Sequence, residues 1–284
     1  MNSLDWQASW QVAPGWDLAI RGEVTPSNRS TEQPGPCVVQ VVKKQKGGSQ
    51  SRLVLCDDGK LYVLKMHPNP QGPNVLANEA LGSMLLHGLG FKVPRWRPIT
   101  INLKTLPFFP ELKMETVDGT KLPACGVHFG SEYLGVRQYP LFDLIPKSYQ
   151  IRNDEQFVAV HLFDLWANHH DFRQCVYRRT KPTVDFEAVF IDNGHLFGGP
   201  NWSHDSDRSV RLWSHFIQEH RGTGSSIMEW YLTQFETHIP QLLLDAVALV
   251  PPEWYKGDIY ALCARLLQRL ESLRGIAKPE RRTS

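Results

Sequence analysis

Residues 161–197 read HLFDLWANHHDFRQCVYRRTKPTVDFEAVFIDNGHLF. The first part of this stretch spaces its apolar side chains as a helix does. Two short apolar runs follow, at residues 174–177 and 188–191, and together they predict a β-hairpin. Asp171 lies just before the first predicted strand, and Asp192 directly follows the second. The hairpin is therefore expected to bring two acidic residues to the same end.

Two carboxylates in this arrangement have a chemical use. One can accept the proton of a hydroxyl group while the other holds a divalent ion on the phosphates of a nucleotide. Gly194, two residues after Asp192, permits a backbone turn that a residue with a Cβ would resist. The alternative is structural, with Asp171 capping a turn and Asp-Asn-Gly serving as an ordinary hairpin signal. This stretch alone leaves both interpretations open.

Size and composition limit the classes of protein to consider. The chain has 284 residues and is 42% hydrophobic, which suits one large domain or two packed lobes. Its formal net charge of +2 provides no basic field for nucleic acid. No apolar stretch approaches the ~20 residues that span a bilayer, and the start lacks a signal-peptide pattern. Five separate cysteines without a CxxC pair suit reduced thiols, so we expect a cytoplasmic protein.

The ends of the chain differ from its middle. Residues 1–36 are polar and contain proline, serine and glycine, which predicts a flexible N-terminal arm. Residues 277–284 are predicted to form a disordered tail. Between them, three short apolar runs at residues 38–42, 52–56 and 61–66 predict antiparallel strands.

The turn after the first of these strands contains a cation and two glycines. Glycine lets backbone N–H groups approach an anion closely, so the turn is a candidate cover for phosphates. A solvated hairpin loop is the alternative. The residues concerned are Lys46, Gly47, Gly48 and Ser49.

Lys65 ends the third apolar strand, where a lysine either extends to solvent or serves as a fixed cation. A helical pattern follows, starting at Asn74 or Asn78 and ending near Gly88, and Glu79 lies among its apolar residues. Lys65 and Glu79 are therefore predicted to form a partly buried ion pair that holds the lysine against nucleotide phosphates.

The remaining segments complete a mixed fold. Residues 94–110 are strand-like but broken by prolines, residues 111–125 predict a loop, and residues 127–134 predict a further strand. The C-terminal part predicts helices, and Pro240 is expected to break one of them.

The order of these parts is that of the protein-kinase-like fold. LWANHHDFRQ at residues 165–174 and FIDNGHLFG at residues 190–198 resemble the catalytic loop and the metal-binding strand end of HipA-like kinases and type II phosphatidylinositol 4-kinases. YVLK at residues 62–65 and NEALGSMLL at residues 78–86 resemble the lysine strand and glutamate helix of the same kinases. From about residue 37 to 275 the chain resembles a HipA-like kinase domain.

The resemblance implies an α+β, two-lobed protein-kinase-like fold. The N-lobe, residues 37–138, would hold a small antiparallel sheet and the glutamate helix. The C-lobe, residues 139–276, would be mostly helical and carry the catalytic and metal-binding loops.

The resemblance also implies a role for each matching residue. Asp171 would be the catalytic base or orient the acceptor hydroxyl, and Asp192 would bind Mg²⁺. Lys65 would bind the α- and β-phosphates of ATP and pair with Glu79. The phosphates would be covered by Lys46, Gly47, Gly48 and Ser49.

Two positions depart from the family pattern. Kinase catalytic loops commonly carry a second metal ligand, an asparagine, five residues after the aspartate, and here that residue is Val176. The nearest amide is Gln174, which becomes the candidate second ligand. Phe172 occupies the place where a cation often follows the aspartate, with Arg173 one residue later. These changes keep open an inactive, nucleotide-binding pseudokinase.

The function that the resemblance implies is ATP- and Mg²⁺-dependent phosphorylation of a protein serine or threonine hydroxyl, as in HipA-like toxins. The expected partners are ATP, an acceptor protein and an antitoxin or regulatory protein, with no nucleic-acid or membrane signature. A metal-dependent hydrolase is a further hypothesis, although its candidate ligands lack a recognisable metal-binding spacing. Those candidates are His161, His169, His170, Asp171 and His195.

Overall fold

The structure is a computed structural model. It describes residues 35–135, 140–144, 149–179, 185–205, 207–219 and 225–277. Most of the arm predicted at residues 1–36 lies outside the described residues, as does the predicted tail after residue 277.

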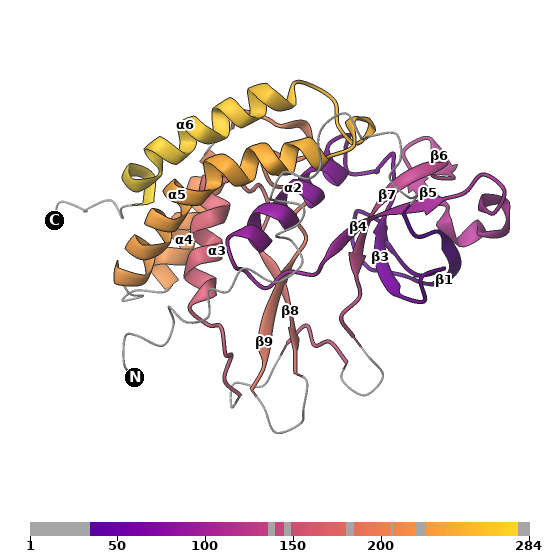
Figure 1. The fold of residues 1–284 in the computed structure, drawn as a ribbon, viewed down its shortest axis with the longest axis horizontal. Coiled ribbons are helices and arrows are strands. Elements are labelled where there is room, and N and C mark those ends of the chain that lie inside the picture. Colours follow the sequence, from indigo (N-terminus) through magenta and orange to yellow (C-terminus); the bar gives the residue numbers. More distant parts are fainter. Residues whose placement is uncertain are drawn as a thin grey trace.

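The N-terminal half forms a five-stranded antiparallel sheet, with the strand order β1-β2-β3-β7-β4 (Figure 1). Its apolar side chains enclose a small core that includes Val54, Leu64 and Ile99. The three consecutive strands predicted from apolar runs are confirmed, and β7 lies between β3 and β4. The strands are β1 (Val38–Lys44), β2 (Arg52–Cys56), β3 (Leu61–Lys65), β4 (Trp96–Ile101) and β7 (Gly126–Glu132).

A short hairpin occupies the region predicted to be a loop. Strands β5 (Met114–Thr116) and β6 (Gly119–Lys121) pair there, preceded by the short 3-10 helices η3 (Leu106–Phe108) and η4 (Pro110–Leu112). The Gln50 side chain bonds both the N–H and the C=O of Glu115, at 2.9 and 2.6 Å. The loop prediction is wrong because this pairing with a distant side chain supports an otherwise weak hairpin.

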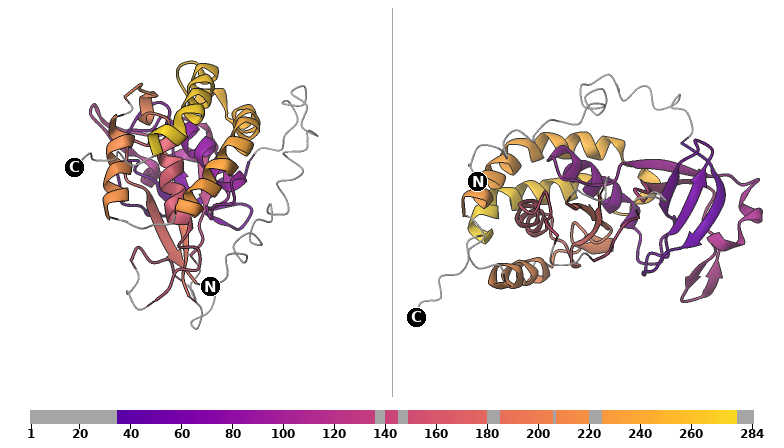
Figure 2. Two further views of the ribbon diagram at one scale, coloured as in Figure 1. Left: turned by 90° about the vertical axis from the view of Figure 1, so that its left-hand side faces the viewer. Right: turned by 90° about the horizontal axis from the view of Figure 1, so that it is seen from below.

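Helices make up most of the C-terminal half, and Figure 2 shows them at the opposite end of the molecule from the sheet. One large hydrophobic core joins α2 to α3, α5 and α6, and α2 also contacts β7. Residues 75–86 of α2 are all buried, so this helix connects the sheet to the helical part. The α-helices of the described residues are α2 (Val75–Gly88), α3 (Gln156–Trp166), α4 (Asp207–Glu219), α5 (Ser225–Leu249) and α6 (Ile259–Ala277).

Helix α5 continues through Pro240, so the expected break is wrong. Proline removes one helical N–H and destabilises a helix interior by about 3 kcal/mol. Ile239 and Leu243 on either side are buried in the large core, with exposed fractions of 0% and 1%. We attribute the unbroken helix to this packing, which outweighs the loss of one hydrogen bond.

Within the described residues, no helix combines the length and apolarity needed to cross a membrane.

The predicted hairpin that carries the two aspartates is present. Strand β8 (Gln174–Arg178) pairs antiparallel with β9 (Glu187–Ile191), with Gln174 opposite Ile191. Asp171 precedes this pair of residues and Asp192 follows it, so both aspartates lie at the same end of the hairpin, as predicted. The 3-10 helices η5 (Gly199–Asn201) and η6 (Pro252–Trp254) complete the fold.

Candidate active site

Three charged side chains from separate segments meet next to the sheet. Lys65 ends β3, Glu79 lies on α2, and Asp192 follows β9. The Lys65 ammonium donates one hydrogen bond to Glu79 Oε1 and another, of 2.9 Å, to Asp192 Oδ1. The side chains of Lys65 and Glu79 are only 9% and 4% exposed, whereas that of Asp192 is 32% exposed. The predicted pair of Lys65 and Glu79 is therefore present, and Asp192 is the most accessible of the three side chains.

The electrostatics keep Lys65 and Asp192 charged. Burial alone would lower the pKa of Lys65, but the carboxylates of Glu79 and Asp192 raise it above its ordinary value. Burial alone would raise the pKa of Asp192, but the charge and hydrogen bond of Lys65 hold it at about 2. Asp192 is thus ionised at neutral pH and offers a charged oxygen at its exposed side.

The backbone around Asp192 is unusual. Asp192 has φ 62°, in the left-handed region that aspartate and asparagine enter more readily than most residues. Gly194 lies close to α2: an added Cβ would lie 3.1 Å from Val75 Cγ1 and 3.2 Å from Glu79 Oε1, which is a tight fit. Gly194 begins a turn, as expected, but its φ is not in the left-handed region, so the constraint on a side chain there is the close approach of the loop to α2.

Helix α2 holds this loop through polar groups that sequence reasoning missed. The Asn78 amide is completely buried and donates to the carbonyls of Gly194 and Leu196, both at 2.9 Å. Gly82, one turn further along, provides room, because an added Cβ would lie 2.7 Å from Asn193 Cβ. The sequence did contain a signal for this contact: Asn78 and Gly82 are an amide residue and a glycine within an apolar helix pattern, close to Glu79.

Arg173 ties the Asp171 segment to the Asp192 segment. Its side chain is 2% exposed, and its guanidinium donates to both carboxylate oxygens of Asp164 on α3. It also donates to Asn193 Oδ1 at 2.7 Å. Burial opposes ionisation of Asp164, but Arg173, followed by His169, holds the pKa of this carboxyl well below its ordinary range. The sequence analysis noted Arg173 only as a cation one residue beyond its usual place. It did not predict that Arg173 links these two segments.

Asp171 is partly exposed at the same end of the hairpin. One of its carboxylate oxygens accepts the N–H of Phe172 at 2.8 Å. His195 lies within the field of both aspartates: burial lowers its pKa, and the charges of Asp171 and Asp192 oppose this shift. The His195 carbonyl also accepts the N–H of His170 at 2.9 Å, which joins the Asp171 loop to the loop after Asp192.

Gln71 lies between the glycine turn at residues 46–49 and His195. Gly47 has φ 113°, and a Cβ added to Gly48 would lie 2.9 Å from Gln71 Nε2. The same Gln71 nitrogen lies 3.2 Å from His195 Nε2. Lys46, Gly47 and Gly48 are exposed, whereas Ser49 is buried. Their role as a phosphate cover stays a prediction.

Gln174 is exposed at the start of β8, opposite Ile191. Ile191, its partner across the hairpin, directly precedes Asp192. The Gln174 side chain forms no hydrogen bond within the described ranges. Its metal-binding role stays a prediction.

The histidines proposed for a hydrolase are not assembled. Among the residues that the structure describes, no three His, Cys, Asp or Glu side chains are placed to hold one metal ion. His161 instead stacks on Phe216 with ring centroids 4.0 Å apart, and the His170 ring bonds the Asp205 carbonyl at 2.8 Å. The hydrolase hypothesis therefore has no support in this geometry.

No protein-family model and no curated protein sequence matches the chain. Solved structures do. The Golgi casein kinase aligns at 13% identity over 86% of this chain and 73% of its own, with a TM-score of 0.56. Its complex with Mn and ADP aligns at the same identity and coverage, with a TM-score of 0.57. The Helicobacter pylori proinflammatory kinase CtkA aligns at 11% identity over 86% of this chain and 97% of its own, with a TM-score of 0.51.

These likenesses show that the chain has a protein-kinase-like fold, and the predicted fold class is confirmed. HipA of Shewanella oneidensis MR-1, in complex with HipB and operator DNA, aligns at 12% identity over 89% of this chain and 69% of its own. Its TM-score of 0.48 is too low to support a closer relationship. The lobe boundaries and the narrower resemblance to HipA stay predictions.

Proposed function

We propose that this protein transfers the γ-phosphoryl group of ATP to a hydroxyl group with the help of a divalent ion. The observation that carries the proposal is the cluster in which Lys65 contacts both Glu79 and Asp192. A strand lysine held by a buried glutamate, next to an ionised and partly exposed aspartate, is the set of charges that protein kinases use for phosphoryl transfer. The nucleotide would lie against β3, where Lys65 can contact its phosphates.

Lys65 is prepared for this role by its partners. Glu79 is the more deeply buried partner and keeps the ammonium in place, whereas Asp192 is accessible. An incoming phosphate is therefore expected to take the hydrogen bond that Asp192 now receives. Charge-assisted hydrogen bonds of this kind are short and strong, which fixes the phosphate position.

The residues present fit a divalent ion at Asp192. Its carboxylate is ionised at any pH well above 2, and it offers the hard oxygen ligand that Mg²⁺ and Mn²⁺ prefer. We propose Mg²⁺ as the ion and Gln174 as a second protein ligand. When bound, the ion would neutralise charge that develops on the phosphate oxygens. The Mn and ADP complex of the Golgi casein kinase supports divalent-ion use on this fold.

Asp171 is the proposed base. Its carboxylate is partly exposed, so an acceptor can reach it, and its segment is held to the Asp192 segment by Arg173. Asp171 would orient the acceptor hydroxyl and receive its proton. We propose a protein serine or threonine as acceptor and an antitoxin-like or other regulatory protein as partner.

A second candidate is a nucleotide-binding module that performs no transfer. It is favoured by Val176 at the position of the expected asparagine and by the exposed Gln174 side chain, which forms no hydrogen bond within the described ranges.

Incorporation of labelled γ-phosphate separates the two candidates. The full chain would be incubated with ATP and either Mg²⁺ or Mn²⁺, alone and with a cell lysate. Incorporation that is lost in Asp171→Asn supports the transferase. Nucleotide binding without incorporation in any of these conditions supports the binding module.

A further inference from the structure

A cavity of about 280 Å³ opens between α3, α4 and the loop that carries the proposed base. Asp171 and Phe172 line it from the loop, Leu165 from α3, and Leu212 and Trp213 from α4. Asp171 is the group proposed to orient the acceptor hydroxyl, so a ligand in this cavity would lie beside that hydroxyl. Pockets for whole small molecules begin at about 300 Å³, and this cavity is of a size for one long side chain.

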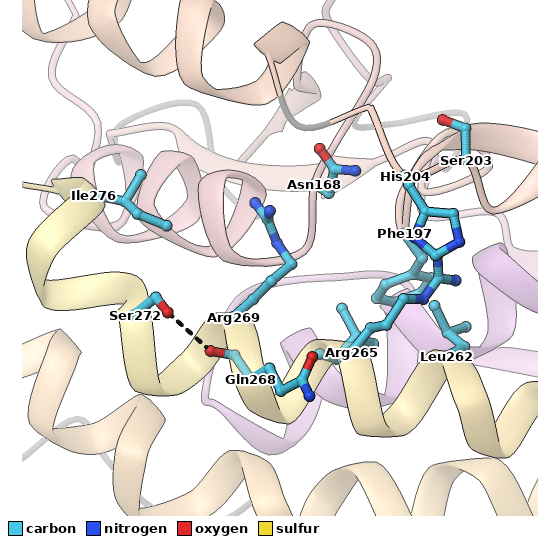
Figure 3. Close-up of a pocket in the computed structure, with 11 residues that line it drawn as sticks. Asn168, Phe197, Ser203, His204, Leu262, Arg265, Gln268, Arg269, Ser272 and Ile276 are labelled. Atoms are coloured by element: carbon cyan, nitrogen blue, oxygen red, sulfur yellow. Dashed lines mark hydrogen bonds between the residues drawn. The ribbon is translucent and has the colours of Figure 1, made fainter.

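The two helices that flank the cavity are joined by an arginine from α6. Figure 3 shows this residue, Arg269, projecting from α6 into a separate region of the molecule. Its guanidinium donates to the carbonyl of Trp166, at the end of α3, at 2.7 Å, and to the hydroxyl of Ser209, on α4, at 3.4 Å. Ser209 also lines the cavity beside Asp171. Arg269 therefore holds α3 and α4 together, so the cavity between them is preformed.

The charges that line the cavity do not cancel. Its lining includes three carboxylates, of Asp164, Asp171 and Glu219, and one guanidinium, of Arg173. Arg173 donates to both oxygens of Asp164, which neutralises this pair. Among the described residues, neither Asp171 nor Glu219 forms an ion pair with a lysine or arginine, and Glu219 lies 3.5 Å from the exposed imidazole of His215. The excess of negative charge attracts a cation.

An exposed aromatic ring accompanies these carboxylates. Phe172 directly follows Asp171, lines the cavity and is 64% exposed, and Leu212 beside it on the lining is partly exposed. A long basic side chain can cover such a surface with its apolar stem while its charged group stays near carboxylates and water. The face of an aromatic ring also attracts a cation. An apolar ligand would leave the negative charge unmatched, and an acidic one would be repelled.

We infer that this cavity binds the side chain of an arginine or lysine that lies close in sequence to the acceptor hydroxyl. The stem would pack on Phe172 and Leu212, and the charged group would lie near Glu219, whose side chain is 60% exposed. The inference rests on the proposed function, because Asp171 marks the place of the hydroxyl. It narrows the acceptor to a serine or threonine in a basic segment.

Fluorescent peptides test the site without any transfer reaction. Each peptide would hold one serine in an alanine background, with arginine at one of the three positions on either side of it. Binding to the full chain would be followed by anisotropy, in the absence of ATP and metal. At least one arginine peptide should bind about fivefold more tightly than the same peptide with glutamine, the upper range for an exposed charge pair. Low ionic strength should increase the difference.

Two exposed lining residues provide variants that should fold. Glu219→Gln should weaken binding of the arginine peptide about threefold and leave the glutamine peptide unchanged, whereas Glu271→Gln, at an exposed position of α6, should change neither. Phe172→Ala should weaken binding of the arginine peptide about threefold through the lost contact with the ring. Phe108→Ala, at a residue of η3 that is 76% exposed, is the matched control and should bind like wild type.

A reversal of charge sharpens the test. Glu219→Lys should bind the peptide more tightly with glutamate than with arginine. The inference is overturned if no arginine peptide binds wild type more tightly than its glutamine counterpart, or if Glu219→Gln and Phe172→Ala both bind the arginine peptide like wild type.

The binding assay also keeps this inference separate from the transferase proposal. A preference for arginine without incorporation of labelled phosphate would support the cavity as a site for basic side chains and count against transfer. Incorporation of label into peptides regardless of their charge would support transfer and overturn the inference.

Discussion

Lys65 Nζ lies 2.9 Å from Asp192 Oδ1, although the two residues are 127 positions apart in the chain. The same ammonium also bonds Glu79, so one cation holds two carboxylates from different segments. Glu79 is buried and Asp192 is partly exposed, so in the proposed function Asp192 is the partner that Lys65 would exchange for a phosphate oxygen. Under the proposed function, a bound nucleotide would separate the charges of Lys65 and Asp192.

Lys65→Ala is expected to abolish the increase in Tm that ATP and Mg²⁺ produce in wild type, because the phosphate ligand is lost. It should also destabilise the apo protein by about 3 kcal/mol, since a buried Glu79 is left without its cation. Thermal melts with and without nucleotide measure both effects.

The double variant Lys65→Ala with Glu79→Gln is the control for that loss of stability. It should recover part of the apo stability, because the unpaired buried charge is gone, yet still show no response to nucleotide. A full ATP response in either variant would rule out Lys65 as a phosphate ligand.

Gly82→Ala tests the contact between α2 and the loop after Asp192. An added Cβ would lie 2.5 Å from Leu196 Cδ1 and 2.7 Å from Asn193 Cβ, so the loop must shift. We expect a loss of about 1–3 kcal/mol of stability, typical of overpacking, together with weaker Mg²⁺-dependent ATP binding. Urea unfolding and nucleotide titration would measure these changes.

Gly275→Ala is a matched control for Gly82→Ala. Gly275 also lies in a helix, α6, but nothing is within 4 Å of an added Cβ there. Alanine should therefore stabilise the protein by up to about 1 kcal/mol through helix propensity alone. Equal stabilisation by both substitutions would show that α2 does not need space for the loop.

Local patterns predicted the parts of the site that lie on single elements. Lys65 ends a short apolar strand, Glu79 lies in an apolar helix, and Asp171 and Asp192 flank a hairpin, so each is visible within a few residues of sequence. The order of the four short motifs along the chain, which resembles that of HipA-like kinases, then indicated that these residues belong to one site. The three-strand start of the sheet was predictable for the same reason, since each of these strands pairs with its neighbour in the sequence.

Contacts between distant segments were not predictable in this way. Asn78 bonds Gly194 across 116 residues, and Gln50 supports the β5–β6 hairpin across 65 residues. Pro240 lies within a helix because of packing that no local rule describes. Arg173 was visible in the sequence, but its bonds to Asp164 and Asn193 depend on how α3 meets the hairpin.

Asp192 should make stability depend on pH in acid. Its pKa in the folded protein, about 2, lies below the ordinary value of 3.8. As the pH falls from about 4 to 2, the unfolded chain therefore binds the proton first, and the stability that Asp192 contributes above pH 4 is lost. Asp192→Asn should lack this part of the acid dependence, which urea unfolding at several pH values measures.

The same variant tests metal binding. Asp192→Asn should abolish phosphoryl transfer and weaken ATP binding more in Mg²⁺ than in EDTA, because the lost charge acts through the ion. Equal weakening in both buffers would indicate that Asp192 has only a structural role beside Lys65.

Asp171→Asn separates the transferase from the binding module. Asp171 makes no contact with Lys65 or Asp192 among the described hydrogen bonds, so its loss should leave ATP affinity nearly unchanged. Transfer of labelled γ-phosphate should fall by a factor on the order of 10² or more, as expected for removal of a positioned base. Gln174→Ala should lower Mg²⁺ affinity with a smaller effect on rate, since the exposed amide is proposed only as a second ligand. If wild type binds ATP without incorporating label in Mg²⁺ or Mn²⁺, and Asp171→Asn changes nothing measurable, the protein is a binding module on a kinase-like fold.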